Sequence, residues 1–218
     1  TFKLYFMHIT VFGATGQVGK RIVQQALNKG FFVTAFGRNV ESLIDQDNLN
    51  EKLTAQKGYL FDEKDVAKAI DKADVIISVL GGTSDGSDKT RSLGMKQIIT
   101  QMQKKGKKRI IALGGMGVLN AEDNTLLLHA EEYPEEYLAV GMEHLKAFEM
   151  LLESNLDWTF FCPADIHDKD ETGIFITSIN YAPDPNHFRI NAGDLAMAML
   201  KSAINHEYIQ QRVGISNY

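Results

Sequence analysis

The chain has 218 residues, a formal net charge of −5, 44% hydrophobic residues and four prolines, which is the composition of a globular protein and excludes an intrinsically disordered chain. The negative charge argues against nucleic-acid binding as the main function, and no apolar run approaches the roughly 18 residues that a membrane span needs. The single cysteine, Cys162, excludes an internal disulfide framework and fits a reducing, cytoplasmic compartment.

Residues 7–218 are interpreted as one α/β domain, because this length lies within the range of a single domain and can bury a good core. Residues 1–6 precede Met7, which stands just before the first predicted strand. We interpret them as an expression remnant and leave them out of the fold.

The stretch at residues 8–39 predicts a βαβ unit with a glycine-rich turn. An apolar strand at residues 9–12 leads into GATGQVG at residues 13–19, and a helix and a second apolar strand at residues 31–36 follow. The first glycine allows a sharp turn, the second lets backbone N–H groups approach a pyrophosphate, and the third lets helix and strand pack closely. The helix N-terminus adds free N–H groups that suit an anion. The predicted dinucleotide loop comprises Gly13, Thr15, Gly16, Gln17, Val18 and Gly19.

The end of the second strand indicates which dinucleotide binds. NAD-selective folds usually place an acid there for the ribose 2′-OH, whereas an arginine suits a 2′-phosphate. This chain has Arg38, and there is no Asp or Glu between Gly30 and Val40. The sequence therefore favours NADP over NAD, with a solvated loop cation as the alternative interpretation of Arg38.

Strand and helix patterns then alternate along the chain. This alternation, with right-handed crossovers, predicts a Rossmann-type doubly wound parallel sheet with helices on both faces. A small C-terminal lobe on the substrate side is predicted from two paired strand segments, at residues 173–181 and 187–190. A last helix opens at residues 191–196, and an edge strand is expected around residues 212–215. The other predicted strands are at 53–60, 74–80, 109–113 and 156–164; the other helices are at 39–45, 63–72, 89–105 and 135–154; polar loops are at 45–52 and 84–89.

Ligands of such sheets bind at the carboxyl ends of the strands, and small residues stand at these ends here. Glycines follow the fourth and fifth strands, where they leave room for the cofactor ribose and nicotinamide; a glycine turn without a ligand is the alternative. At the third strand end, Tyr59 is expected beside the adenine, with simple packing as the alternative. The predicted contacts at these ends are Tyr59, Leu60, Leu80, Gly81, Gly82, Leu113, Gly114 and Gly115.

The GxxGxxG spacing of residues 13–19 and the segment LDWTFFCPA at residues 156–164 resemble the atypical short-chain dehydrogenase/reductase superfamily. The second segment is similar to that of its NmrA-like and flavin-reductase-like (biliverdin reductase B-like) branch, as is NAGDLA at residues 191–196. The resemblance covers nearly the whole chain. It implies that Pro163 and Ala164 flank the nicotinamide. It also implies that His167 lines the substrate pocket as the first choice for a titrating catalytic group, with a plain loop residue as the alternative.

The chain departs from this pattern where catalysis is concerned. In relatives, the third strand usually ends in Gly-Asp, and this chain has Tyr59 in place of that acid. The fifth strand of relatives usually ends in a serine, and this chain has Gly115 and Met116 there. The Tyr-x-x-x-Lys acid/base pair is missing, because none of the seven tyrosines is followed by lysine four positions later. His144, in the predicted helix at 135–154, is the second catalytic candidate; a buried structural histidine is the alternative.

These features leave more than one function open. The first is an NAD(P)H-dependent oxidoreductase of the flavin- or quinone-reductase type, with FMN or FAD as a substrate, because hydride transfer to such an acceptor draws most of its chemistry from the cofactors. The second is a non-catalytic, NmrA-like NADP sensor that reports to a protein partner. The third, an NAD-dependent epimerase or dehydratase, needs the missing Tyr/Lys pair. A small-molecule substrate is expected, without a nucleic-acid, membrane or metal partner.

Overall fold

The computed structural model describes residues 7–44, 50–83, 85 and 87–218. The predicted remnant at 1–6 and the parts of the predicted loops at 45–49, 84 and 86 lie outside the described residues. The main sheet has eight strands in the order β3-β2-β1-β4-β5-β6-β10-β8. Its pairings are parallel except for β10 with β8. The strands are β1 (His8–Phe12), β2 (Phe32–Gly37), β3 (Leu53–Lys57), β4 (Val75–Ser78), β5 (Arg109–Leu113), β6 (Asp157–Pro163), β8 (Phe175–Ile179) and β10 (Gln211–Asn217).

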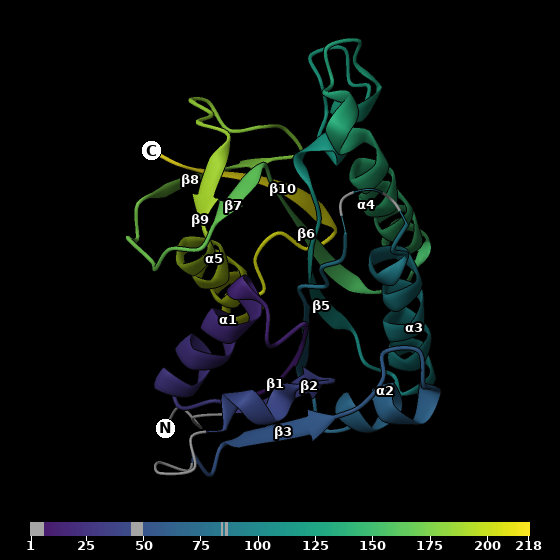
Figure 1. Cartoon of the computed structure of the whole chain (residues 1–218), viewed down its shortest axis with the longest axis vertical. Coiled ribbons are helices and arrows are strands. Elements are labelled where there is room, and N and C mark those ends of the chain that lie inside the picture. Colours follow the sequence, from purple (N-terminus) through teal and green to yellow (C-terminus); the bar gives the residue numbers. More distant parts are fainter. Residues whose placement is uncertain (1–6, 45–49, 84, 86) are drawn as a thin grey trace.

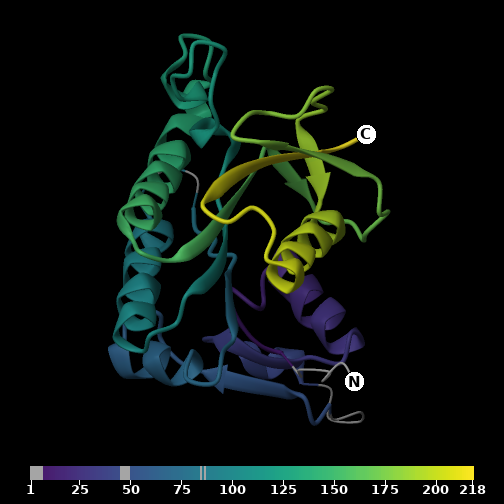
Figure 2. The ribbon, with the colours of Figure 1, turned by 180° about the vertical axis from the view of Figure 1, so that it is seen from behind.

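Helices cover both faces of this sheet (Figure 1; Figure 2 shows the same arrangement from behind). Helices α1 (Gln17–Asn28) and α5 (Ala192–Asn205) pack together on one face, and α2 (Glu63–Ala69), α3 (Thr90–Lys104) and α4 (Glu135–Glu153) lie on the other. Each layer encloses its own apolar core. The predicted Rossmann-type doubly wound fold is therefore confirmed. Short 3₁₀ turns are η1 (Val40–Leu43), η2 (Met116–Val118) and η3 (Leu127–His129).

The central strands explain why sequence patterns predicted this sheet well. All four residues of β4 are buried, and three of them are apolar, because parallel strands in the middle of such a sheet have helices on both faces. Strand β1 pairs in parallel with β2 on one side and β4 on the other. The strand order reverses between β1 and β4, and this reversal is the point where doubly wound sheets open a crevice for a ligand.

The C-terminal lobe is built differently from the prediction. Strand β8 does not pair with the 187–190 segment but runs antiparallel to β10, at the edge of the main sheet. Strand β9 (Arg189–Asn191) pairs instead with β7 (Asp165–His167), in a separate two-stranded sheet. The prediction that residues 212–215 form an edge strand is also wrong, since β10 lies between β6 and β8. Most of β10 is buried, and a buried strand needs a partner on each side for its backbone groups.

Asp194, in the first turn of α5, joins this lobe to the domain. Its side chain is fully buried and its carboxylate accepts hydrogen bonds from three other segments of the chain. The donors are the backbone N–H and hydroxyl of Thr172, the N–H of Gly173 and the side-chain amides of Asn191 and Asn217. These hydrogen bonds give Asp194 a structural role.

Candidate functional site

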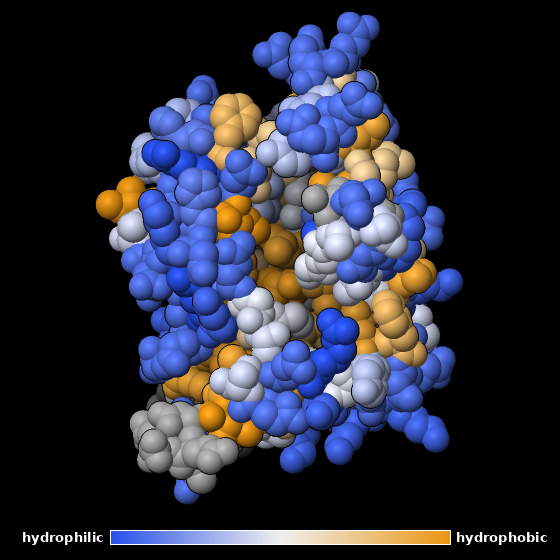
Figure 3. All heavy atoms as spheres, viewed as in Figure 1, coloured by the Kyte–Doolittle hydropathy of each residue, from blue (hydrophilic) through white to orange (hydrophobic). Residues whose placement is uncertain are grey.

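A deep cleft with a volume of about 1190 Å³ opens at the carboxyl ends of the parallel strands. Figure 3 shows it as a hollow with hydrophobic side chains at its base. Sites for one small ligand usually enclose about 300–1,000 Å³, so this cleft has room for a dinucleotide and part of a second molecule. Every residue predicted to contact the cofactor lines it: Gly13, Thr15, Gly16, Gln17, Val18, Gly19, Arg38, Tyr59, Leu60, Leu80, Gly81, Gly82, Leu113, Gly114, Gly115, Pro163 and Ala164.

The glycines of the cleft are of two kinds. Gly13 has a φ of +80°, and a Cβ there would lie 2.4 Å from the carbonyl oxygen of Val79; a Cβ on Gly19 would lie 2.1 Å from the carbonyl oxygen of Gly13. These two positions must be glycine for the backbone to fold. A Cβ on Gly81 would meet no atom within 4 Å. The space over Gly81 is therefore open to a ligand, as a cofactor crossing this strand end requires.

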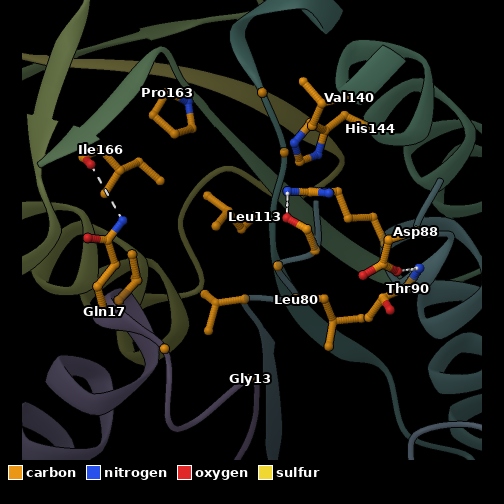
Figure 4. Close-up of a pocket in the computed structure, with 18 of the residues that line it drawn as sticks. Gly13, Gln17, Leu80, Asp88, Thr90, Leu113, Val140, His144, Pro163 and Ile166 are labelled. Atoms are coloured by element: carbon orange, nitrogen blue, oxygen red, sulfur yellow. Dashed lines mark hydrogen bonds between the residues drawn. The ribbon is translucent and has the colours of Figure 1, made fainter. Parts of the chain in front are cut away.

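The glycine loop leaves an anion site at the start of α1. Gly16 is the N-cap of this helix, its first turn contains no acid, and no side chain caps it. The first N–H groups of a helix have no intrahelical partner, and they carry the positive end of its dipole. A pyrophosphate fits this environment. The Gln17 side chain donates to the Ile166 carbonyl across the cleft (3.4 Å), which joins the loop to β7 (Figure 4).

Arg38 and Tyr59 border the end of the cleft at β2 and β3. Arg38 is exposed and makes no hydrogen bond or ion pair with any described residue, so its guanidinium is available to a phosphate. Asp62 is the N-cap of α2, since its carboxylate accepts hydrogen bonds from the N–H groups of Lys64 and Asp65. The Asp65 carboxylate accepts the N–H of Tyr59 (2.9 Å) and so fixes this tyrosine at the rim, where its ring is 64% exposed.

At the end of β5, His144 fills the space that a side chain would need. A Cβ on Gly115 would lie 2.8 Å from Cδ2 and 3.4 Å from Nε2 of the His144 ring. The serine that the family resemblance implies at this strand end would therefore collide with the imidazole. Because the His144 ring occupies this space, the chain has a glycine and no hydroxyl at position 115. Figure 4 places His144 and Val140 on one wall of the cleft, opposite Gln17 and Ile166.

His144 is a neutral imidazole at physiological pH. Burial lowers its pKa to about 3; the positive charge of Arg91 acts in the same direction, and Glu143 opposes them. Only 9% of the residue is exposed, and its Nδ1 is enclosed without a hydrogen-bond partner. This burial agrees with the alternative interpretation of His144, a buried structural histidine, and argues against a charged acid at this position. A neutral imidazole can still donate a hydrogen bond from its other nitrogen.

His167, the first catalytic candidate from the sequence, does not line the cleft. It is exposed at the end of β7, whereas its neighbours Asp165 and Ile166 do line the cleft. His167 is the last residue of β7, one position beyond the two residues that border the cleft. The family resemblance implied that a residue of this segment lines the pocket, but the lining residues are Asp165 and Ile166 and not His167.

Several lining residues were missed by the sequence analysis. Arg91 at the start of α3 and Tyr133 and Tyr137 at the start of α4 all border the cleft. Burial raises the pKa of Tyr133, and the nearby Tyr137 acts in the same direction, so this phenol stays protonated at neutral pH. No local motif marks these residues, because only the packing of α3 against α4 brings them to the strand ends.

Other kinds of site were also considered. Within the part of the chain that the structure describes, no three His, Cys, Asp or Glu side chains gather as metal ligands. The described helices include none with the length and apolarity to cross a membrane. The thiol of Cys162 is buried, and burial raises its pKa, so it behaves as a small apolar side chain in β6.

The model of the NAD(P)H-binding family matches residues 13–206, a range that begins at the glycine loop and ends with α5. The chain belongs to this family. The resemblance seen in the sequence is therefore confirmed at the level of NAD(P)H binding. What the matched proteins act on is a separate question.

Solved structures of other proteins have the same fold over nearly the whole length of this chain. A Burkholderia pseudomallei protein, provisionally described as exported, is 30% identical, with a TM-score of 0.81 and coverage of 96% of this chain and 99% of that one. A provisionally named epimerase from Bacteroides thetaiotaomicron is 27% identical, with a TM-score of 0.82 and 97% coverage of both chains. A provisionally named NADH-flavin reductase from Streptococcus pneumoniae is 23% identical, with a TM-score of 0.81 and coverage of 97% and 100%, and supports the fold alone.

One added methyl group should affect the two kinds of glycine differently, with a loss of cofactor binding at one and a loss of stability at the other. We expect Gly81→Ala to keep the free energy of unfolding within about 0.5 kcal/mol of wild type, since nothing obstructs the new Cβ. The same methyl should weaken NADPH binding by about 1–3 kcal/mol, the usual cost of overpacking a contact. Gly19→Ala should instead destabilise the fold. Urea unfolding measures the stability of each variant, and NADPH titration measures its affinity for the cofactor. If Gly81→Ala binds NADPH as tightly as wild type does, the cofactor does not cross this strand end.

The buried imidazole predicts a pH dependence of stability. Between the unfolded pKa of 6.5 and the folded pKa of about 3, the unfolded chain binds a proton at His144 that the folded chain does not. Stability from this residue is therefore present above pH 6.5 and is lost as the pH falls toward 3. From pH 7 to pH 5 the loss should be about 2 kcal/mol, and His144→Gln should remove that part of it.

Urea unfolding at pH 7 and pH 5 measures this difference. His129→Gln is the matched control, because His129 is exposed. An unfolding free energy with the same pH dependence in His144→Gln and wild type would show that His144 is not buried in its neutral form.

Proposed function

We propose that the protein is an NADPH-dependent oxidoreductase that transfers hydride to a flavin or quinone. The observation that carries this proposal is the neutral imidazole of His144, which lies over Gly115 at one end of a cleft large enough for a dinucleotide and an acceptor. The residues present fit the cofactor, because the glycine loop and the space over Gly81 form a cradle that side chains would fill.

In this proposal each part of the cleft holds one part of NADP. The N-terminus of α1 binds the pyrophosphate, Arg38 binds the 2′-phosphate and Tyr59 lies against the adenine. The ends of β4 and β5 form the floor under the nicotinamide, which supplies the hydride when the cofactor is bound. Pro163 and Ala164 at the end of β6 border the same floor.

The remaining space in the cleft suits a flat, conjugated acceptor. Its walls are mainly apolar and aromatic, and they come from η2, η3, α4 and the C-terminal lobe. Such walls exclude water and favour stacking of a ring against the nicotinamide. The lining residues of this acceptor compartment are Met116, Leu127, Tyr133, Pro134, Tyr137, Val140, Ile166 and Phe188.

His144 takes over the hydrogen bonding that the missing serine and tyrosine provide in relatives. Its Nδ1 is enclosed without a partner, whereas its Nε2 edge faces Gly115, so we assign the ring proton to Nε2. An N–H donor at this position stabilises the negative charge that develops on an acceptor oxygen or nitrogen as it is reduced. A neutral histidine is suited to this task, as it is in triosephosphate isomerase, where a helix N-terminus keeps the imidazole uncharged.

A non-catalytic NADP sensor is the second candidate function. The missing Tyr-x-x-x-Lys pair favours it, as does the absence of a charged acid at His144. A protein partner would then receive the signal. The epimerase candidate has less support, because Tyr133 is followed four positions later by Tyr137 and not by lysine.

Turnover with defined acceptors separates these functions. We expect purified protein to oxidise NADPH with FMN or a soluble quinone, and His144→Leu to lower kcat by about ten- to hundredfold through loss of the hydrogen bond. His144→Gln, which keeps an amide N–H, should recover part of this loss. Tight NADPH binding with no turnover of any acceptor would support the sensor and reject the enzyme.

A further inference from the structure

Arg91, in the first turn of α3, is a cation held rigidly in the wall of the cleft. Its Nη1 donates to the carbonyl of Thr83 (2.9 Å) and its Nη2 to the carbonyl of Gly82 (3.1 Å). These bonds fix the guanidinium against the segment that follows β4. They use two of its five N–H groups, and the enclosed Nε has no partner. The outer N–H groups remain available to a ligand.

The positive charge of Arg91 has no carboxylate partner among the described residues. The nearest acids serve other groups: Glu143 accepts from Ser92 and pairs with Lys89 and Lys146, and Asp88 accepts the N–H of Thr90. Burial lowers the pKa of Arg91, although the charges of Asp88 and Glu143 oppose this effect. A half-buried cation without an ion pair costs free energy, and an anionic ligand would offset that cost.

The position of Arg91 indicates which ligand would supply the anion. Arg91 lines the same cleft as His144, and its charge lowers the pKa of that residue, so the two side chains are close enough to interact. The pyrophosphate site is at α1, on the other face of the sheet from α3, and the 2′-phosphate candidate Arg38 lies at the end of β2. Both anions of the cofactor therefore have their own sites, whereas the walls of the acceptor compartment are mainly apolar and aromatic, with Glu132 and Asp165 also among the residues that line the cleft.

We propose that Arg91 is a specificity residue that binds an anionic group, a phosphate or carboxylate, on the hydride acceptor while the conjugated ring of that acceptor lies beside His144. This inference rests on the proposed reductase function. A guanidinium suits the task because its planar fork matches a phosphate or carboxylate with two parallel hydrogen bonds. The substrate class is thus a flat, conjugated molecule with an anionic arm.

FMN and riboflavin provide a matched pair of probes, because they share one ring system and differ by the phosphate. With wild-type protein and saturating NADPH, we expect kcat/KM to be at least tenfold higher for FMN, mainly through KM. Arg91→Met should reduce this preference to less than about threefold, and Arg91→Lys, which keeps the charge without the fork, should retain an intermediate preference. Lys96→Met is the control, since Lys96 is an exposed cation on the same helix.

Binding measurements separate the possible outcomes. Calorimetric titration of both flavins into protein saturated with NADP⁺ should show the same preference as the kinetics. Equal losses for FMN and riboflavin in Arg91→Met, or a large loss of NADPH affinity, would assign Arg91 to the cofactor or to the loop and overturn the inference. Preferential FMN binding without turnover would reject flavin reduction but support the anion site. Binding of neither flavin would overturn the inference and would exclude flavins as acceptors of the proposed reductase.

Discussion

The reversal of strand order between β1 and β4 determines where a ligand can bind to this protein. The connections from these two strands leave toward opposite faces of the sheet, and the space between them becomes the cleft. Gly13 lets the chain turn off β1 within contact distance of the β4 backbone, where any side chain would collide with the carbonyl of Val79. The anion site at α1, the open space over Gly81 and the floor at β5 all depend on this close approach.

A second constraint shapes the end of the cleft where chemistry is proposed. The imidazole of His144 occupies the volume that a serine at the end of β5 would need, so this chain has either the histidine or the hydroxyl. Burial keeps the ring uncharged, which removes a proton-transferring acid but leaves a directed hydrogen-bond donor. Reduction of a flavin or quinone tolerates that exchange better than reduction of an isolated carbonyl, because the conjugated acceptor spreads the added charge itself.

Local sequence patterns predicted the parts of the structure that depend on neighbours along the chain. The glycine loop, the strand ends and Arg38 follow directly from short motifs on buried parallel strands, and all of them meet in one cleft. The pairing of β8 with β10 and of β9 with β7 could not be predicted, because short strands of mixed polarity fit several partners.

The same limit applies to side chains in the site. The position of His167 relative to the cleft depends on where β7 lies in the C-terminal lobe. The place of Arg91 depends on how α3 packs beside α4, and no periodicity encodes either. The burial of His144 was one of two interpretations of its place in the predicted helix, and only the packing of its ring over Gly115 decides between them.

In the proposed function, the cleft binds NADP through the glycine loop and a contact between Arg38 and the 2′-phosphate. The most direct test is the dissociation constant of NADPH and of NADH for wild type and Arg38→Ala, with Lys64→Ala as a control for an exposed cation outside the cleft. The loss of a charge-assisted contact should weaken NADPH binding by about 1–3 kcal/mol and leave NADH binding nearly unchanged. Equal weakening of both cofactors, or of neither, would contradict this account.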